Sequence, residues 1–175
     1  MKKEVEQDIL NWVTEYVEVN HKFYNYKFPP CPYARAARLK GLLDIVAYES
    51  GSARDFINSQ TEDLLSTQKY NTRVLVFPAK FRWYFHIHWF IRKLNIKIIN
   101  KDFYAQYGRA VKTQSKYNEL LKDKPYFIVI INKLSDVLDG HESLLKTDYY
   151  SAWPIKHYKD IVLRRNKFVE KYKKD

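Results

Sequence analysis

The feature that most constrains the fold is an unbroken apolar run from Pro125 to Ile131 (PYFIVII), rich in β-branched residues. A run of this kind is typical of a buried strand at the centre of a sheet. Arg73 to Phe77 (RVLVF), closed by Pro78, has a similar character and predicts a second strand.

Hydrophobic periodicity predicts helices between these strands. Apolar residues at three-to-four spacing predict helices over 4–19, 81–95, 135–145 and Pro154–Tyr172. Ser52 and Asp55 resemble a capping box ahead of a further helix, and Cys31-Pro32 opens a short one. The remaining predictions are a loop over 21–30, strands over 42–48 and 96–99, and a long polar segment over 103–124. The alternation predicts an α/β or α+β fold: a single domain over residues 1–175, with a mixed sheet of about four strands flanked by helices.

Composition sets the broad class. The chain has 175 residues, 46% of them hydrophobic, which is enough to bury one core. No apolar run approaches the roughly 18 residues of a membrane span, so we expect none. Met1 to Lys3 is followed by acidic residues rather than by the apolar stretch of a secretory signal. With one cysteine there is no intramolecular disulfide, and we expect a cytoplasmic protein.

The net charge of +11 is unevenly distributed. Residues 1–20 carry two Lys against five acids, a net charge of −3, whereas residues 154–175 carry eight Lys or Arg against three acids, a net charge of +5. A surplus of this size favours anionic partners: phosphates, nucleic acid, acidic proteins or an anionic membrane face. The alternative is that the chain is basic only because its composition is rich in lysine, and that the charge serves no particular partner.

The segment around the single cysteine carries the clearest chemical signal. A thiol at a helix N-terminus lies at the positive end of the helix dipole, and nearby cations stabilise its thiolate. Arg35 and Arg38 follow Cys31 on one helical face, where they could also hold a phosphate or a carboxylate. The alternative is that Cys31 is a small buried apolar residue.

Two families share motifs with this segment. Cys31 to Ala34 resembles the Cys-Pro-Tyr-Cys site of glutaredoxins, but the preceding strand and the later glutathione-binding motifs are missing, which argues against that family. The chain also resembles a family of uncharacterised bacterial cytoplasmic proteins with a Leu-Cys-Pro-Phe-Ala signature. The matching motifs follow in the same order: Trp12, Cys31–Ala34, Leu75–Pro78, Tyr104–Gly108, Pro125-Tyr126 and Arg165-Asn166. This resemblance implies a common fold rather than an activity, because the family's function is not established.

The leading hypothesis is a small enzyme or ligand-binding protein with a cationic pocket around Cys31. The cysteine would act as a thiolate nucleophile or line the pocket. An anionic small molecule would be held and oriented by Arg35, Arg38, Arg165, Asn166, Lys133 and Tyr107. No cofactor is expected, because the four glycines are isolated and form no phosphate-binding loop.

Two alternatives use the basic C-terminal helix. The first is a nucleic-acid-associated protein whose phosphate contacts come from Lys156, Lys159, Arg164, Lys167 and Lys171. The second is a non-catalytic interaction protein that binds an acidic partner through the same face. Without a partner, these cations would simply be solvated near the C-terminal end of a helix dipole.

No metal site is predicted. His86 and His88 could share a metal only on a strand, and we favour a helix there, on which the two side chains point about 200° apart. Asp136, Asp139 and Glu142 are spaced along one helical face, which is more typical of a solvated surface than of a cation site.

Overall fold

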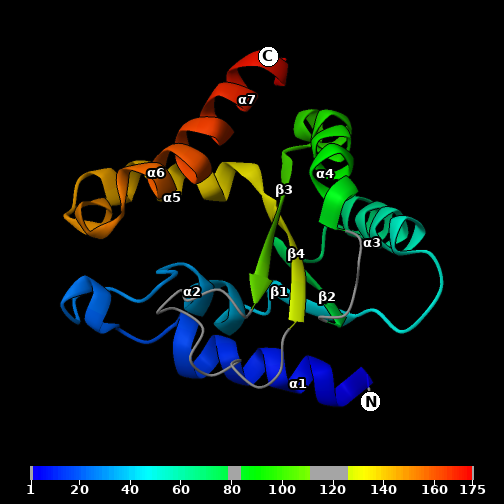
Figure 1. The fold of residues 1–175 in the computed structure, drawn as a ribbon, viewed down its shortest axis with the longest axis horizontal. Coiled ribbons are helices and arrows are strands. Elements are labelled where there is room, and N and C mark those ends of the chain that lie inside the picture. Colours follow the sequence, from blue (N-terminus) through cyan, green and yellow to red (C-terminus); the bar gives the residue numbers. More distant parts are fainter. Residues whose placement is uncertain (1, 79–83, 111–125, 175) are drawn as a thin grey trace.

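The computed structural model describes residues 2–78, 84–110 and 126–174 of the chain (Figure 1). Within these ranges one four-stranded sheet has the order β1-β2-β4-β3. Its strands are β1 (Leu43–Ala47), β2 (Thr72–Pro78), β3 (Phe103–Ala110) and β4 (Tyr126–Lys133). Strands β1 and β2 are parallel, and β4 runs antiparallel to both β2 and β3. The expected mixed sheet flanked by helices is confirmed, and the fold is of the α+β class.

Helical segments precede, connect and follow the strands. The first three are α1 (Lys2–Trp12), the π-helical turn η1 (Val13–Val17) and the 3-10 turn η2 (Lys22–Tyr24). The central ones are α2 (Ala34–Leu39), α3 (Ala53–Thr67), α4 (Tyr84–Ile98) and η3 (Ile99–Lys101). The last are α5 (Leu134–Leu145), η5 (Tyr149–Ala152), α6 (Ile155–Tyr158), the π-helical turn η6 (Lys159–Leu163) and α7 (Arg164–Tyr172).

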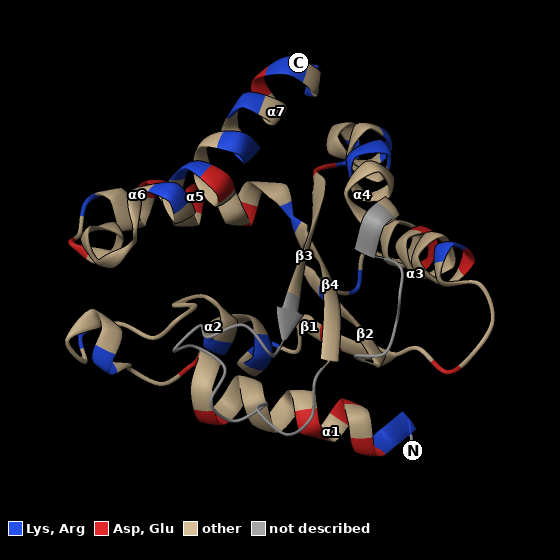
Figure 2. Cartoon of the chain, viewed as in Figure 1, with Lys and Arg blue, Asp and Glu red and all other residues tan. Residues whose placement is uncertain are grey.

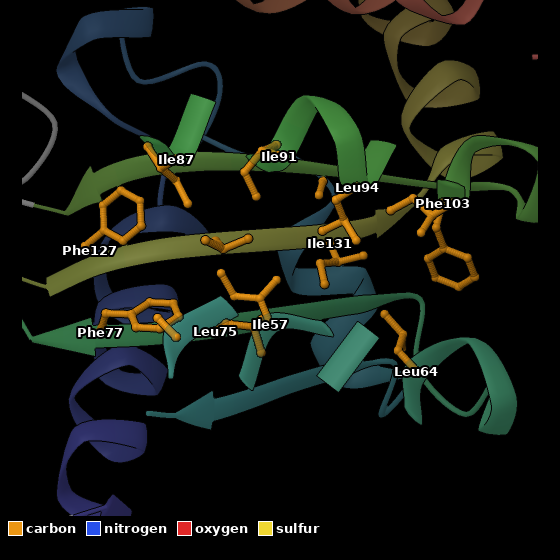
Figure 3. Close-up of a cluster of buried hydrophobic side chains, with 14 residues drawn as sticks. Ile57, Leu64, Leu75, Phe77, Ile87, Ile91, Leu94, Phe103, Phe127 and Ile131 are labelled. Carbon is orange, nitrogen blue, oxygen red and sulfur yellow. The ribbon is translucent and has the colours of Figure 1, made fainter. Parts of the chain in front are cut away.

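The two inner strands, β2 and β4, are buried on both faces, as their apolar runs predict. On one face they pack against α3 and α4 in the larger core (Figure 3), which includes Leu75, Phe77, Phe127, Val129 and Ile131. On the other face they pack against α1 and η1 through Val74, Val76, Ile128, Ile9 and Val13. Continuous apolar character is therefore required, because successive side chains of each strand enter opposite cores.

Two sequence predictions are wrong. Residues 96–99 are not a strand; they complete α4 and begin η3. Residues 103–110 form β3 instead of a polar segment, while 111–124 lie outside the described residues. Phe103 and Ala105 enter the larger core, and Gln106 is exposed. This alternation is weak in the sequence because alanine is small, and pairing with β4 decides the conformation.

The helix predictions hold over the described residues, with changes at the ends, while residues 81–83 of the helix predicted over 81–95 lie outside the described residues. The region 4–19 is α1 continued by η1, and the region after Pro154 is α6, η6 and α7 in succession. Ser52 caps α3, since its Oγ accepts the backbone N–H of Asp55 at 3.3 Å. The short helix after Cys31 begins only at Ala34. None of the described helices combines the length and the apolar character that a membrane crossing requires.

A side chain of α4 closes part of one sheet edge. Asn95 is only 3% exposed, and its Nδ2 donates to the carbonyl oxygen of Ala105 at 2.8 Å. In return, the backbone N–H of Ala105 donates to Oδ1 of Asn95 at 2.6 Å. The amide therefore replaces a neighbouring strand at this position of β3, which satisfies two buried backbone groups.

Candidate functional site

Hydrogen bonds to three other elements hold the loop that carries Cys31 in place. The backbone N–H of Cys31 donates to the carbonyl oxygen of Val17 at 3.1 Å, at the end of the π-helical turn η1. The hydroxyl of Tyr149 donates to the carbonyl oxygen of Pro30 at 2.6 Å. The hydroxyl of Tyr33 donates to the carbonyl oxygen of Gly140 at 2.6 Å. Residues on both sides of Cys31 are thereby joined to the C-terminal helices.

The environment of the Cys31 thiol favours its protonated form. Cys31 is half-buried as a residue, and its thiol is not in a disulfide. Burial raises the pKa of the thiol above its ordinary value, more than the backbone N–H groups of Tyr33 and Ala34 lower it, and the carboxylate of Glu18 raises it further. The thiolate expected for a nucleophile is therefore not stabilised here.

The two arginines near Cys31 have different surroundings. Arg35 is exposed. Arg38 donates from Nε and Nη2 to the two carboxylate oxygens of Glu18, each at 2.8 Å, and the Glu18 side chain is only 4% exposed. Arg38, predicted to hold an anionic small molecule, is thus engaged in a bidentate ion pair with a carboxylate of the protein itself.

Tyr107 and Lys133, which were predicted to orient a ligand in the Cys31 pocket, lie away from Cys31. Tyr107 lies on β3, and its ring packs beside that of Phe127 at a centroid distance of 6.0 Å, on the side of the sheet covered by α3 and α4. Lys133 ends β4, and its backbone N–H donates to the carbonyl oxygen of Asn71 at 2.7 Å. Cys31, in contrast, is bonded to η1 on the opposite side.

Arg165, at the start of α7, is a buried cation with a neutral partner. It is 8% exposed, and its Nε and Nη2 donate to Oδ1 of Asn166 at 3.1 and 3.0 Å. Within the described ranges no carboxylate forms an ion pair with it. Burial lowers the pKa of its guanidinium, which is the effect expected when a positive charge loses its water.

Aromatic side chains from four elements interact with the charge of Arg165. They are Tyr104 of β3, His141 of α5, Tyr150 of η5 and Tyr158 of α6. Burial raises the pKa of Tyr104 and raises that of Tyr150 to about 12, while burial and then the charge of Arg165 lower the pKa of His141. Near neutral pH Tyr104, Tyr150 and His141 are therefore uncharged. We call Arg165, Asn166 and these four aromatic residues the Arg165 centre.

The Arg165 centre and the Cys31 loop border the same aromatic cluster. Nδ1 of His141 lies 3.0 Å from the hydroxyl of Tyr150. The ring of Tyr150 contacts that of Tyr149 at 5.1 Å, and Tyr149 stacks on Tyr24 at 4.7 Å. Among the described residues, no hydrogen bond joins Cys31 to Arg165 directly. Cys31 and Arg165, which were expected to share one pocket, thus border the same aromatic cluster without a direct hydrogen bond between them.

Sequence reasoning missed the aromatic members of the Arg165 centre. His141 and Tyr150 are nine residues apart in the chain, and Tyr104 comes from a strand that was predicted as a polar segment. The dense tyrosines near residue 150 were a visible signal, but the fold was needed to bring them to Arg165.

A basic surface extends over two neighbouring helices (Figure 2). Nη2 of Arg92 donates to the hydroxyl of Tyr172 at 3.1 Å, and the backbone N–H of Lys174 donates to Oδ1 of Asn100 at 2.9 Å. These contacts place the end of α7 beside α4 and η3. The exposed cations there, which we call the α4–α7 surface, are Arg92, Lys93, Lys97, Lys101, Arg164, Lys167, Lys171, Lys173 and Lys174. Lys156 and Lys159 are exposed nearby on α6 and η6.

The residues considered for metal binding are not brought together. His86 and His88 are both exposed on α4, which is helical as expected. Asp136 accepts a hydrogen bond from Nδ2 of Asn71 at 2.6 Å. Over the described ranges, no group of three or more His, Cys, Asp or Glu side chains is arranged to hold a metal ion.

Comparison of the chain with protein-family models, with curated proteins and with solved structures finds no match. The resemblance to the uncharacterised bacterial family stays a prediction. Function is therefore argued from the geometry alone.

Proposed function

We propose that the protein associates with nucleic acid and binds its phosphate backbone through the α4–α7 surface. The observation that carries this proposal is that the basic C-terminal helix does not stand alone. Apart from the buried Arg165, residues 84–101 and 164–174 together contain nine Lys and Arg and one Glu, a net charge of +8 out of +11 for the chain. Two neighbouring helices with this charge suit a polyanion better than a single small anion.

Most of these cations are available to a ligand. Arg164 pairs with Asp160 at 2.9 Å, and Lys173 pairs with Asp102 at 3.4 Å. Lys93, Lys97, Lys167 and Lys171 are exposed, and none of them forms an ion pair with a carboxylate in the part of the chain that the structure describes. These four lysines are therefore the expected phosphate contacts.

An exposed tryptophan favours single-stranded nucleic acid over an acidic protein. Trp89 of α4 is 62% exposed, and Arg92 and Lys93 follow it by three and four positions on the same helical face. A base that stacks on an exposed aromatic ring adds about 1–3 kcal/mol, while neighbouring cations hold its phosphates. An acidic protein partner would have no particular use for this arrangement.

The other hypotheses are supported less well. A nucleophilic Cys31 would need a stabilised thiolate, whereas burial raises the pKa of this thiol. Arg38, one of its proposed substrate ligands, is engaged by Glu18. Binding of an acidic protein through the basic helix becomes an outcome of the experiment below.

The test is binding of a fluorescently labelled single-stranded oligonucleotide at several salt concentrations. If four lysines each neutralise one phosphate, affinity should fall about 50-fold between about 50 and 200 mM salt. A variant with Lys93, Lys97, Lys167 and Lys171 changed to Gln should bind weakly and lose most of this salt dependence. Trp89→Ala should weaken binding at every salt concentration, because stacking is not ionic.

The control is a variant with Lys40→Gln and Lys146→Gln, which removes two exposed charges outside the α4–α7 surface. It should bind almost as the natural chain does. Absence of oligonucleotide binding at low salt would refute the proposal. Binding of an acidic protein in its place, lost in the four-lysine variant, would support the interaction hypothesis.

A further inference from the structure

The chain buries two arginines in contrasting ways. Arg73 is 3% exposed, and it forms ion pairs with Asp44 at 2.7 Å and with Asp63 at 2.8 Å. Arg165 is 8% exposed and donates only to the neutral side chain of Asn166 among the described residues. Burying a cation without a counter-ion is costly, because no nearby negative charge replaces the lost hydration. Arg165 therefore lacks a compensating group that Arg73 has.

The groups around Arg165 can donate hydrogen bonds but carry no negative charge. Burial raises the pKa of Tyr104 and of Tyr150, which therefore retain their hydroxyl protons near neutral pH, and a neutral hydroxyl donates readily to an oxyanion. Oδ1 of Asn166 accepts hydrogen bonds from Nε and Nη2 of Arg165, and no described residue accepts one from Nη1. The centre thus combines one positive charge, an uncommitted guanidinium nitrogen and several hydroxyls.

We propose that the Arg165 centre is a binding site for a phosphate group, anchored by Arg165 and lined by Tyr104, Tyr150 and Tyr158. A phosphate suits this arrangement better than a carboxylate, because its tetrahedral oxygens accept hydrogen bonds from several directions and it carries up to two negative charges. The three tyrosines come from β3, η5 and α6, all three interact electrostatically with the guanidinium, and the rings of Tyr150 and Tyr158 contact each other at a centroid distance of 5.2 Å. This site is separate from the α4–α7 surface and does not depend on it.

The experiment measures the melting temperature of the full chain while inorganic phosphate replaces chloride at constant ionic strength. The natural chain should be stabilised in a saturable manner, since a ligand that binds only the folded state raises its stability. Arg165→Met, which keeps an unbranched side chain and removes the charged guanidinium, should weaken phosphate binding by at least about tenfold. Arg54→Met, which changes an exposed arginine of α3 outside both proposed sites, is the control and should preserve the response.

A natural chain that does not respond to phosphate would overturn the proposal, as would an Arg165→Met variant that responds equally well. If Arg165→Met does not fold, Tyr104→Phe decides, because it removes one hydroxyl and keeps the ring. Weaker phosphate binding by Tyr104→Phe would support the site, and unchanged binding would overturn it.

The source of the phosphate group is distinguished by adding the oligonucleotide. If the oligonucleotide displaces inorganic phosphate from the natural chain, the site receives a nucleic acid backbone. If both bind together, the site serves a small phosphorylated ligand. The variant that lacks Lys93, Lys97, Lys167 and Lys171 should keep its phosphate response, so that failure of the α4–α7 surface and failure of this site give different results.

Discussion

Gly140 lies in the middle of α5 because the ring of Tyr33 occupies the space that a larger side chain would need. A Cβ atom at position 140 would lie 2.8 and 2.9 Å from two carbons of that ring. The same ring is held in place by the hydrogen bond from its hydroxyl to the carbonyl oxygen of Gly140. Gly140→Ala therefore tests how firmly the Cys31 loop is docked on α5.

Two opposing effects set the expected magnitude. Alanine in a helix interior is favoured over glycine by about 1 kcal/mol. Displacing the Tyr33 ring loses a hydrogen bond worth about 1 kcal/mol, and overpacking costs about 1–3 kcal/mol. Together these effects should make Gly140→Ala lower the free energy of unfolding by about 1–3 kcal/mol. In a Tyr33→Ala background the same substitution should raise it by about 1 kcal/mol, because only the helix preference remains.

Urea denaturation of the natural chain, the two single variants and the double variant measures this reversal of sign. The coupling free energy between the two positions should be about 2–4 kcal/mol. Glu142→Ala, an exposed change on the same helix, is the control and should have equal effects in both backgrounds. If Gly140→Ala stabilises the natural chain as much as it stabilises the Tyr33→Ala variant, the close contact is not real and the reasoning fails.

Three further predictions concern buried polar groups. Asn95→Leu leaves the backbone N–H and carbonyl of Ala105 without partners and should lower the free energy of unfolding by about 2–4 kcal/mol. The amide hydrogen of Ala105 should also exchange faster with solvent. An unchanged exchange rate would contradict this prediction. Because burial raises the pKa of the Cys31 thiol, alkylation of the folded protein by a neutral reagent should be slower than that of the unfolded chain and should still be rising at about pH 8. A rate that levels off below pH 7 would show the opposite. Since the pKa of His141 is lowered from 6.5 in the folded state, the unfolded chain takes up the proton first, and the free energy of unfolding should fall as pH drops below about 6.5. His141→Gln should reduce this loss, which denaturation at about pH 7.5 and 5.5 measures; an unchanged pH dependence would count against the assignment.

The fold was predictable for the strands that are buried on both faces of the sheet. The sequence is apolar at every position over 74–77 and 125–131, so the central place of these strands needs no information from elsewhere in the chain. Strand β3 was not predictable in this way, because Ala105 and Gly108 give little alternation and the strand exists through its pairing with β4. Residues 96–99 show the reverse case: β-branched residues there continue a helix that α4 had already begun.

The candidate site was predictable only in part. The charge of the C-terminal helix was evident in the sequence, but its juxtaposition with α4 was not, because α4 and α7 are about seventy residues apart. Arg38 was predicted from residue type and spacing to hold an anionic small molecule, but its ion pair with Glu18 was not predictable, because Glu18 lies twenty residues earlier in the chain. The surroundings of Cys31 could not be read from its neighbours in sequence, since the groups that bury it come from distant elements.

The amide of Asn95 has a consequence for what can associate with the sheet. A strand that paired with β3 from outside would need both the donor and the acceptor of Ala105, and both are already occupied by a side chain of the same molecule. Exposed strand edges otherwise act as templates on which other chains assemble. The side chain of Asn95 therefore hinders the addition of a strand from another molecule to the β3 edge, and so limits assembly of several molecules into one continuous sheet.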